Sequence, residues 1–275
     1  MPFSASVIVG AGALFISVTA CAAQTGPPAV SGTEPPAVSA GCAERAVQRQ
    51  LDRAAAILGD WAGLGRYRED NARLAPPGRS DARVVFMGDS ITDFWDEERA
   101  GGFFPGKPYV NRGISGQTTP QMLVRFRPDV LALSPRAVVI LAGTNDLAGN
   151  TGATSLAAIE GNLASMAELA HAHGIRVVLA SLLPVSDDHR DADGRPLVRT
   201  ACRPPDQIQA LNERIRRYAT GHNHVYLDYA SALADARGML KADVTEDGLH
   251  PNAKGYAVMA PLAEKAIAAG LGPRR

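Results

Sequence analysis

The sequence predicts an α/β protein, a three-layer α/β/α sandwich around a sheet of about five parallel strands. Two observations lead to this prediction. From Ala82 onward, short runs of apolar, largely β-branched residues alternate with longer stretches of helical character. Parallel strands need crossover connections of one hand, and helices in those crossovers cover both faces of the sheet.

Five apolar runs fit the buried strands of such a sheet. Strands covered on both faces carry nearly continuous apolar residues rather than an alternating pattern. In folds of this class, ligand sites form where loops leave the carboxyl ends of the strands. The runs are 83–88 (RVVFMG), 108–113 (PYVNRG), 137–143 (AVVILAG), 176–184 (RVVLASLLP) and 224–229 (HVYLDY).

Helical spacing predicts the segments that cover the sheet. Between Ser155 and His173, apolar residues recur every three or four positions, and Gly174 follows as a C-cap. We expect further helices from about Asp206 and from about Ala253.

A similar spacing over residues 43–74 predicts a helix ahead of the first strand. Its apolar positions would form one face that packs against the main body. These positions are Ala46, Leu51, Ala55, Leu58 and Trp61.

Composition excludes several classes of protein. The 275 residues are 46% hydrophobic and 20% charged, which excludes a disordered, collagen-like or coiled-coil chain. The 28 Lys and Arg residues balance 28 Asp and Glu residues, so no net charge attracts nucleic acid. Three cysteines are too few for a disulfide scaffold, although Cys42 and Cys202 could form one bridge in an oxidising compartment.

The N-terminus predicts an exported protein, periplasmic or extracellular. Residues 1–23 contain an apolar stretch before the first charged residue, Glu34, and are interpreted as an export signal, with an uncleaved membrane anchor as the alternative. Cys21 fits a lipoprotein signal, and ordinary cleavage is equally compatible with its neighbours. Residues 24–41, rich in Pro, Ser and Gly, are interpreted as a tether, which leaves 42–275 as the folded domain.

Four polar blocks lie where the predicted fold places ligand sites. They are 87–93 (MGDSITD), 111–119 (NRGISGQTT), 141–146 (LAGTND) and 245–252 (TEDGLHPN). Ser90 would stand at a helix start, where unpaired N–H groups suit a negative oxygen, although a capping serine is the simpler alternative. Asn145 could likewise be only a turn former. Asp247 precedes His250 by three residues, so its carboxylate can orient the imidazole.

Taken together and in order, these blocks resemble the four signature blocks of the SGNH hydrolases, also called GDSL esterases. The resemblance runs from Gly88 to Asn252 and covers most of the folded chain. It implies a flavodoxin-like SGNH hydrolase fold and a serine esterase with a Ser-His-Asp triad. In this sequence the triad falls on Ser90 as nucleophile, His250 as base and Asp247 as the acid that orients the base.

The resemblance also implies an oxyanion hole with three donors. These are the backbone N–H of Ser90, the backbone N–H of Gly116 and the side-chain amide of Asn145. Gly116 is the glycine that precedes Gln-Thr-Thr in the second block, so Gly113 is interpreted as a turn residue.

No metal or cofactor is expected. The sequence has no HExxH, CxxC, EF-hand or phosphate-loop motif, and the family resemblance implies no cofactor. Asp89, Asp93 and Asp146 could be imagined as a cation cluster, but each is expected to brace its own turn.

The other histidines lack the carboxylate turn that marks His250. His171 and His173 end a predicted helix, and His222 and His224 lie in a predicted surface turn, so structural roles are expected. His189, in a long polar loop, stays open as an alternative base.

The expected substrate is a small-molecule or carbohydrate ester. Short acyl esters are favoured, including O-acetyl groups of carbohydrates, because an exported enzyme meets polysaccharide and the family includes carbohydrate acetylesterases. The same family includes lysophospholipases and thioesterases, and an acyltransferase would use the same triad. A catalytically idle binding module is the further alternative.

A long connection from Val185 to Asp206 follows the fourth predicted strand. Loops of this length in a compact domain are usually functional or disordered, and this one leaves the sheet at the expected ligand edge. Its Asp, Arg and Pro residues predict a polar wall or lid that favours small acyl groups. A surface excursion unrelated to the chemistry is the alternative.

Overall fold

The computed structural model of the chain describes residue 54 and residues 58–78, 82–97 and 100–272. All of them belong to one compact unit, Gln50–Arg275. The predicted export signal (1–23), the tether (24–41) and Cys42 lie outside the described residues. Among the residues described, no helix is both long and apolar enough to cross a membrane.

The sheet has five strands, all parallel, in the order β2-β1-β3-β4-β5. This arrangement confirms the predicted fold class. Each strand lies within one of the apolar runs expected from the sequence. The strands are β1 (Val84–Gly88), β2 (Tyr109–Gly113), β3 (Ala137–Leu141), β4 (Arg176–Ala180) and β5 (Val225–Leu227).

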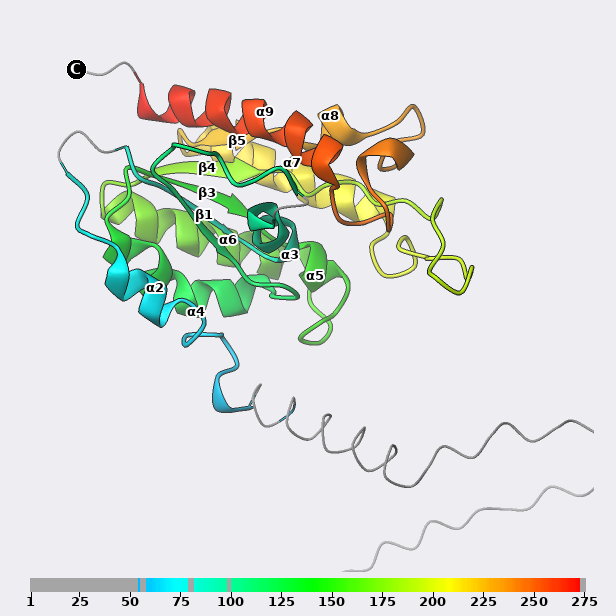
Figure 1. Cartoon of the computed structure of the whole chain (residues 1–275), viewed down its shortest axis with the longest axis horizontal. Coiled ribbons are helices and arrows are strands. Elements are labelled where there is room, and N and C mark those ends of the chain that lie inside the picture. The colour runs from blue at the N-terminus through cyan, green and yellow to red at the C-terminus, as the bar shows by residue number, and fades with distance from the viewer. Residues whose placement is uncertain (1–53, 55–57, 79–81, 98–99, 273–275) are drawn as a thin grey trace, which may run out of the picture. The chain divides into compact units, whose positions relative to one another are not determined.

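Helices cover both faces of this sheet. In Figure 1, α9 lies on one side, and α4 and α6 lie on the other. The helices are α2 (Arg68–Arg73), α3 (Ser90–Asp93), α4 (Thr119–Asp129), α5 (Thr144–Leu147), α6 (Leu156–Ala172), α7 (Pro205–Gly221), α8 (Ala230–Leu233) and α9 (Ala253–Leu271). Short 3₁₀ turns occur at Phe94–Asp96, Leu131–Leu133 and Ala242–Val244.

Two apolar clusters hold the three layers together. Alternate strand residues point to opposite faces, so Val85 and Met87 pack with α4, α6 and α7. Val84 and Phe86 pack instead with α3 and α9. Because both faces are buried, the strands carry apolar residues without alternation, which is why their sequence pattern was readable.

The predicted helix ends are also borne out. The Ser155 side chain accepts a hydrogen bond from Ala158 N at 3.1 Å and caps α6 at its start. Gly174, with φ of 71°, follows the last turn. The helices expected near Asp206 and Ala253 are α7 and α9.

The predicted N-terminal helix over 43–74 is wrong for its described part between Asp60 and Tyr67. The Asp60 carboxylate accepts hydrogen bonds from the backbone of Leu64 and Gly65, both at 2.7 Å, and these bonds fold the chain into a turn. Helix resumes only in α2. Of the apolar residues expected to form its buried face, the two that the structure describes are exposed, Leu58 by 86% and Trp61 by 42%.

The strand order places a crevice beside the carboxyl end of β1. The chain leaves β1 toward β2 on one side, and β3 pairs with β1 on the other side. Such a reversal of strand order opens a ligand-binding crevice in sheets of this kind. The loops after β1, β2 and β3 carry Ser90, Gly116 and Asn145 to this edge.

Candidate active site

Ser90 is the first residue of α3, directly after β1. Asp89 is the helix N-cap, because its Oδ1 accepts a hydrogen bond from Ile91 N at 3.0 Å. The capping alternative for Ser90 is therefore wrong, and its hydroxyl is available for another partner. Gly88 is required before this turn, since a Cβ there would collide with the Thr92 side chain.

A chain of two hydrogen bonds joins Ser90, His250 and Asp247. The Ser90 Oγ lies 2.9 Å from His250 Nε2, and His250 Nδ1 lies 2.7 Å from Asp247 Oδ2. An ionised carboxylate only accepts, so the proton lies on Nδ1 and Nε2 accepts the hydrogen bond from Ser90. This arrangement can activate a hydroxyl as a nucleophile.

The turn between Asp247 and His250 fixes the imidazole. Asp247 Oδ1 accepts the backbone N–H of Leu249 at 2.9 Å and of His250 at 2.8 Å. Burial opposes ionisation of Asp247, but the hydrogen bonds from His250 and Leu249 hold its pKa well below the usual range. Gly248 has φ of 78°, and a Cβ there would strike the Ser186 carbonyl. The spacing read in the sequence thus reflects a tight turn that needs glycine.

The three predicted oxyanion donors come from the loops after β1, β2 and β3. Within the described chain, the backbone N–H groups of Ser90 and Gly116 donate to no other group. The Asn145 side chain is buried, with Nδ2 donating to the Gln117 carbonyl at 3.1 Å. An amide nitrogen carries two hydrogens, so Asn145 retains one for a ligand.

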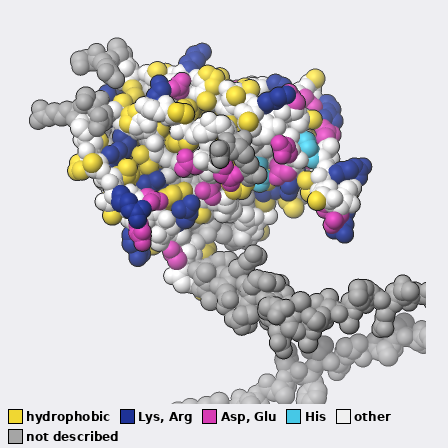
Figure 2. Space-filling model, viewed as in Figure 1, with side chains coloured by type: hydrophobic (Ala, Val, Ile, Leu, Met, Phe, Trp, Pro, Cys, Tyr) yellow, Lys and Arg dark blue, Asp and Glu magenta, His cyan; other side chains and the backbone are white. Residues whose placement is uncertain are grey.

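A pocket of about 690 Å³ lies beside His250. Its walls combine the Phe94 and Tyr256 rings with the carboxylates of Asp243 and Glu246. The Phe94 ring packs 5.0 Å from the imidazole, centroid to centroid. Figure 2 shows acidic side chains in magenta among basic and apolar ones on the face in view. The pocket therefore offers an apolar wall and a polar rim.

A second hollow, of about 550 Å³, is lined in part by Gly116. Trp61 and Asn150 line it, and Asn150 Nδ2 donates to the Gly116 carbonyl at 2.9 Å. The Trp61 carbonyl accepts from the Gln121 side chain at 2.6 Å, which ties this segment to α4. This turn, which was predicted to be a helix, thus places the Trp61 ring near Gly116.

Arg199 and Arg203, in the loop after β4, contact candidate site residues. Neither arginine was predicted from the sequence to belong to the site. Arg199 donates from Nε to the Asp247 carbonyl at 2.8 Å and from Nη2 to Oδ2 at 3.1 Å. Arg203 donates from Nη2 to Asn145 Oδ1 at 3.3 Å. Their only sequence signal was the Arg content of a long loop at the ligand edge.

Asp89, beside the nucleophile candidate, has an unusual environment. It is fully buried, and its Oδ2 has no hydrogen-bond partner in the described part of the chain. Burial is the main cause that raises its pKa to about 6, against the lowering effects of the Ile91 backbone and His250. The charged form of this carboxylate therefore destabilises the fold.

The remaining candidates have partners of their own. Asp93 accepts from Ser115 Oγ at 2.7 Å, and Asp146 accepts from Thr119 N at 3.0 Å, so each braces a neighbouring loop. No group of residues in the described chain could hold a metal ion. Cys202 is exposed, and its bridge to Cys42 stays a prediction.

The other histidines lie elsewhere. His173 and His222 each bond through Nδ1 to a carbonyl of their own helix, at 2.8 and 2.9 Å. His171 and His224 pack with their rings 6.3 Å apart. His189 has a 3.5 Å contact with Ser186 Oγ and is three residues away from it in the same loop. Of the six, His250 is the one bonded to both a serine and a carboxylate.

Comparison with known proteins agrees with this geometry. Residues 86–258 match the GDSL-like lipase/acylhydrolase family. A solved GDSL-like lipase from Bacteroides thetaiotaomicron VPI-5482 is 42% identical, with a TM-score of 0.68, over 76% of this chain and 98% of that one. A protein of Bacteroides fragilis NCTC 9343 assigned as an acylhydrolase is also 42% identical, with a TM-score of 0.69, over 78% and 99%.

Two further similarities are narrower. An acetyl-xylooligosaccharide esterase from Geobacillus shares the fold at 20% identity, with a TM-score of 0.55, over 73% of this chain and 99% of that one. The uncharacterized lipoprotein YqeF of Bacillus subtilis is 37% identical over 79 residues, which is 28% of this chain. That match spans only 32% of the length of YqeF.

Proposed function

Because this chain belongs to the GDSL-like lipase/acylhydrolase family and is a carboxylic ester hydrolase, we propose that Ser90, His250 and Asp247 are its catalytic triad. The observation that carries the proposal is the hydrogen-bonded chain from Ser90 Oγ through the imidazole to the Asp247 carboxylate. His250 takes the Ser90 proton while Oγ attacks the acyl carbonyl. Asp247 stabilises the imidazolium that forms.

The reaction then proceeds through an acyl-enzyme. The tetrahedral intermediate collapses, the imidazolium gives its proton to the leaving alcohol, and the acyl group stays on Ser90. Water, deprotonated by His250, attacks the acyl-enzyme and releases the acid and free Ser90. The Ser90 N–H, the Gly116 N–H and Asn145 Nδ2 hold the oxyanion during both acylation and deacylation. Each donor lowers the activation barrier by about 2 to 4 kcal/mol.

The substrate in this proposal is a short acyl ester of a polar alcohol, such as an O-acetyl group on a carbohydrate. The polar rim of the pocket beside His250 supports a polar leaving alcohol. The exposed Trp61 ring next to Gly116 offers an apolar face bordered by amide and hydroxyl groups, which suits a sugar ring. The Geobacillus acetyl-xylooligosaccharide esterase is a precedent for this chemistry on the same fold.

Lysophospholipase or thioesterase activity, and acyl transfer to a sugar, are the alternatives that the same triad could support. A long-chain substrate needs an extended apolar channel, whereas the walls of the pocket beside His250 include Asp243, Glu246 and Lys254. Transfer would be recognised by product that forms faster than free acid when a sugar acceptor is added. A preference for long acyl chains would instead favour the lysophospholipase or thioesterase alternative.

The proposal also places the enzyme outside the cytoplasm, lipid-anchored at Cys21. The apolar segment ahead of Cys21 and the similarity to a Bacillus lipoprotein support this. Expression of the full chain in a bacterial host with labelled fatty acid should give a labelled membrane protein. Cys21→Ala should lose the label, and a cytoplasmic, unprocessed wild type would contradict the localisation.

The experiment that tests the proposed function is a substrate profile. We expect kcat/KM to be highest for acetyl among p-nitrophenyl esters of two to twelve carbons, and acetylated xylooligosaccharides to release acetate. Ser90→Ala should abolish both activities. A maximum at eight carbons or longer would contradict the short-acyl proposal, and an active Ser90→Ala enzyme would contradict the triad.

A further inference from the structure

The loop between β4 and α7 ends in an arginine that touches the third polar block. Arg203 is only 9% exposed, which is unusual for a charged side chain. Its Nε donates to Thr144 Oγ1 at 3.1 Å, and its Nη2 donates to Asn145 Oδ1 at 3.3 Å. The guanidinium therefore lies against the start of α5, directly behind the Asn145 amide.

The partners of the Asn145 amide determine which way it faces. A guanidinium has only hydrogen-bond donors, so the amide oxygen must face Arg203. The opposite end, Nδ2, then faces the Gln117 carbonyl, which can only accept. A flipped amide would set donor against donor at one end and acceptor against acceptor at the other.

From these contacts we propose that Arg203 is a positioning residue of the oxyanion hole, which holds the Asn145 amide with its N–H groups toward the reacting carbonyl. The inference rests on the proposed role of Asn145 in the esterase mechanism. In the part of the chain that the structure describes, Arg203 makes no hydrogen bond to the Ser90 nucleophile. It acts through the amide that it orients and polarises, because a hydrogen bond accepted at Oδ1 makes the N–H groups better donors.

The surrounding structure keeps Arg203 in place. Its backbone N–H donates to the Arg199 carbonyl at 3.1 Å, and Pro204 follows it directly, which restricts its backbone. On the far side of Asn145, Gln117 is anchored by its own side chain, which donates to the Ala62 carbonyl at 2.7 Å and accepts from Arg125 Nε at 2.5 Å. The amide therefore lies between two fixed partners.

Arg203 lies in the field of a buried carboxylate near the hole. Burial and the Arg199 charge lower the pKa of Arg203, and the charge of Asp89, which is fully buried next to Ser90, opposes this lowering. A neutral side chain at position 203 would leave the Asp89 carboxylate less compensated. A substitution there can thus act on stability as well as on catalysis, so the test must separate the two.

A double-mutant cycle makes this separation. With p-nitrophenyl acetate, we expect Arg203→Met to lower kcat about 10- to 100-fold with KM within about threefold, since the lost donor alignment matters mainly once the oxygen is charged. In an Asn145→Ala background, the same Arg203→Met change should lower kcat less than about threefold. Arg203→Lys, which keeps the charge and a donor, should recover part of the loss and serves in the cycle if Arg203→Met does not fold.

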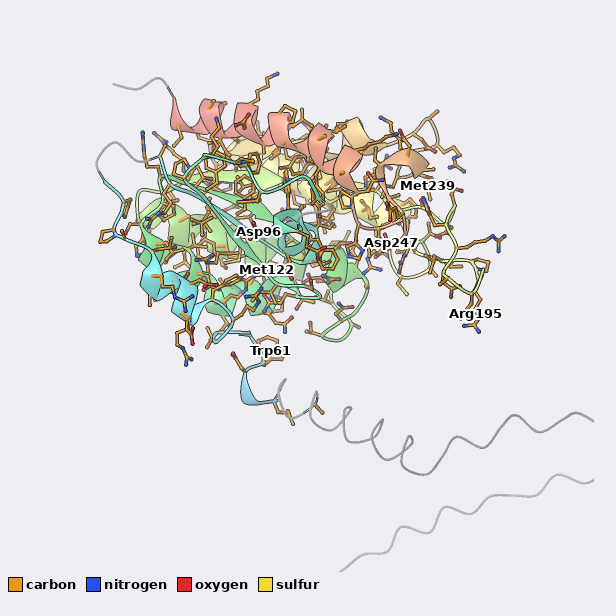
Figure 3. All side chains as sticks on the ribbon, in the orientation of Figure 1. Trp61, Asp96, Met122, Arg195, Met239 and Asp247 are labelled. Atoms are coloured by element: carbon orange, nitrogen blue, oxygen red, sulfur yellow. The ribbon has the colours of Figure 1, made fainter. Side chains whose placement is uncertain are left out.

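Arg195 is the matched control, because it belongs to the same loop, its side chain is 76% exposed, and its ion-pair partner is Asp193. Figure 3 shows it at the outer end of that loop. Arg195→Met should leave kcat and KM unchanged. Additive losses of kcat in the double mutant would overturn the positioning role of Arg203 but not the proposed oxyanion hole. A fully active Asn145→Ala enzyme would overturn the proposed oxyanion hole and this inference with it.

Discussion

The two halves of the candidate site are held in different ways. The nucleophile half, Ser90, His250 and Asp247, is a direct chain of side-chain hydrogen bonds, and its imidazole and carboxylate are about one-quarter to one-third exposed. The oxyanion half depends on the buried Asn145, whose side chain is held by a carbonyl on one side and by Arg203 on the other. The reacting groups of the first half bond directly to one another, and Arg199 braces only its outer member, Asp247. The oxyanion donor of the second half is instead oriented entirely by residues that take no part in the chemistry.

This difference predicts how strongly a substitution in each half affects catalysis. A substitution in the nucleophile half removes a reacting group, so its effect should be large and confined to chemistry. A substitution near the oxyanion half should lower kcat only in part, because the amide donor stays present but loses its alignment.

His250→Ala should have the largest effect. Without a base, kcat should fall by about 10⁴-fold or more, because Ser90 Oγ is a weak nucleophile when protonated. Asp247→Asn should be less severe if Arg199 and the turn keep the ring near Ser90. Steady-state rates with p-nitrophenyl acetate measure both. A His250→Ala enzyme within tenfold of wild type would contradict the assignment of the base.

Asn145→Ala should come next. Removing one oxyanion donor costs about 10²- to 10³-fold in kcat, and KM should change little because the ground-state carbonyl is uncharged. A trifluoromethyl ketone inhibitor, which forms a tetrahedral adduct, should lose affinity in parallel. A raised KM with unchanged kcat would instead make Asn145 a substrate-binding residue.

Asp89→Asn should change the pH dependence of stability. The rise of its pKa from 3.8 to about 6 means that its folded state favours the proton. Stability from this group is therefore complete below pH 3.8 and is lost as pH rises through about 6. Between pH 4 and pH 8, the unfolding free energy of Asp89→Asn should rise by about 2 kcal/mol relative to wild type. The amide oxygen of the new side chain can still accept the hydrogen bond from Ile91 N that caps α3.

Urea denaturation of both proteins at the two pH values measures this gain. Asp228→Asn is the control, because that exposed carboxylate also accepts a backbone N–H at the start of a helix, that of Ser231 at 2.9 Å, but stays solvated. The stability difference in the control should vary far less with pH. An Asp89→Asn difference that is the same at pH 4 and pH 8 would show that burial of the charge has no energetic cost.

Trp61→Ala should have the smallest effect, limited to sugar substrates. Loss of an aromatic contact worth about 0.5 to 1.5 kcal/mol predicts KM for acetylated xylooligosaccharides raised roughly 3- to 10-fold. Rates with p-nitrophenyl acetate should be unchanged. Leu58→Ala, at the more exposed neighbouring position, is the control and should alter neither. Equal loss on both substrates would place Trp61 in the support of the Gly116 loop instead of in sugar binding.

The comparison also explains which features could be predicted from sequence. The strands were predictable because each is a short, nearly continuous apolar run, and α6 was predictable because its apolar residues recur every three or four positions. The turn from Asp247 to His250 was predictable because the interacting residues are three apart. The contact between Arg203 and Asn145 joins residues 58 positions apart, and nothing in the spacing of an Arg-rich loop reports it.

The prediction of a helix before α2 was wrong for a different reason. The apolar residues of that segment have helical spacing, but the Asp60 carboxylate offers the backbone of Leu64 and Gly65 hydrogen bonds that compete with a helix. Gly63, with φ of 68°, makes the turn easy to form. The selectivity expected of the loop from Val185 to Asp206 stays a prediction. The contacts that it makes with Asp247 and Asn145 bear on catalysis.

The proposed mechanism requires that His250 activate Ser90 and that Ser90 carry the acyl group. Covalent labelling with diisopropyl fluorophosphate, followed by peptide mass spectrometry, measures this activation at the residue itself. We expect one label per chain, on Ser90, formed in step with loss of esterase activity and at least 100-fold slower in His250→Ala. Loss of activity with the label on another residue, or equal labelling rates in wild type and His250→Ala, would contradict this mechanism.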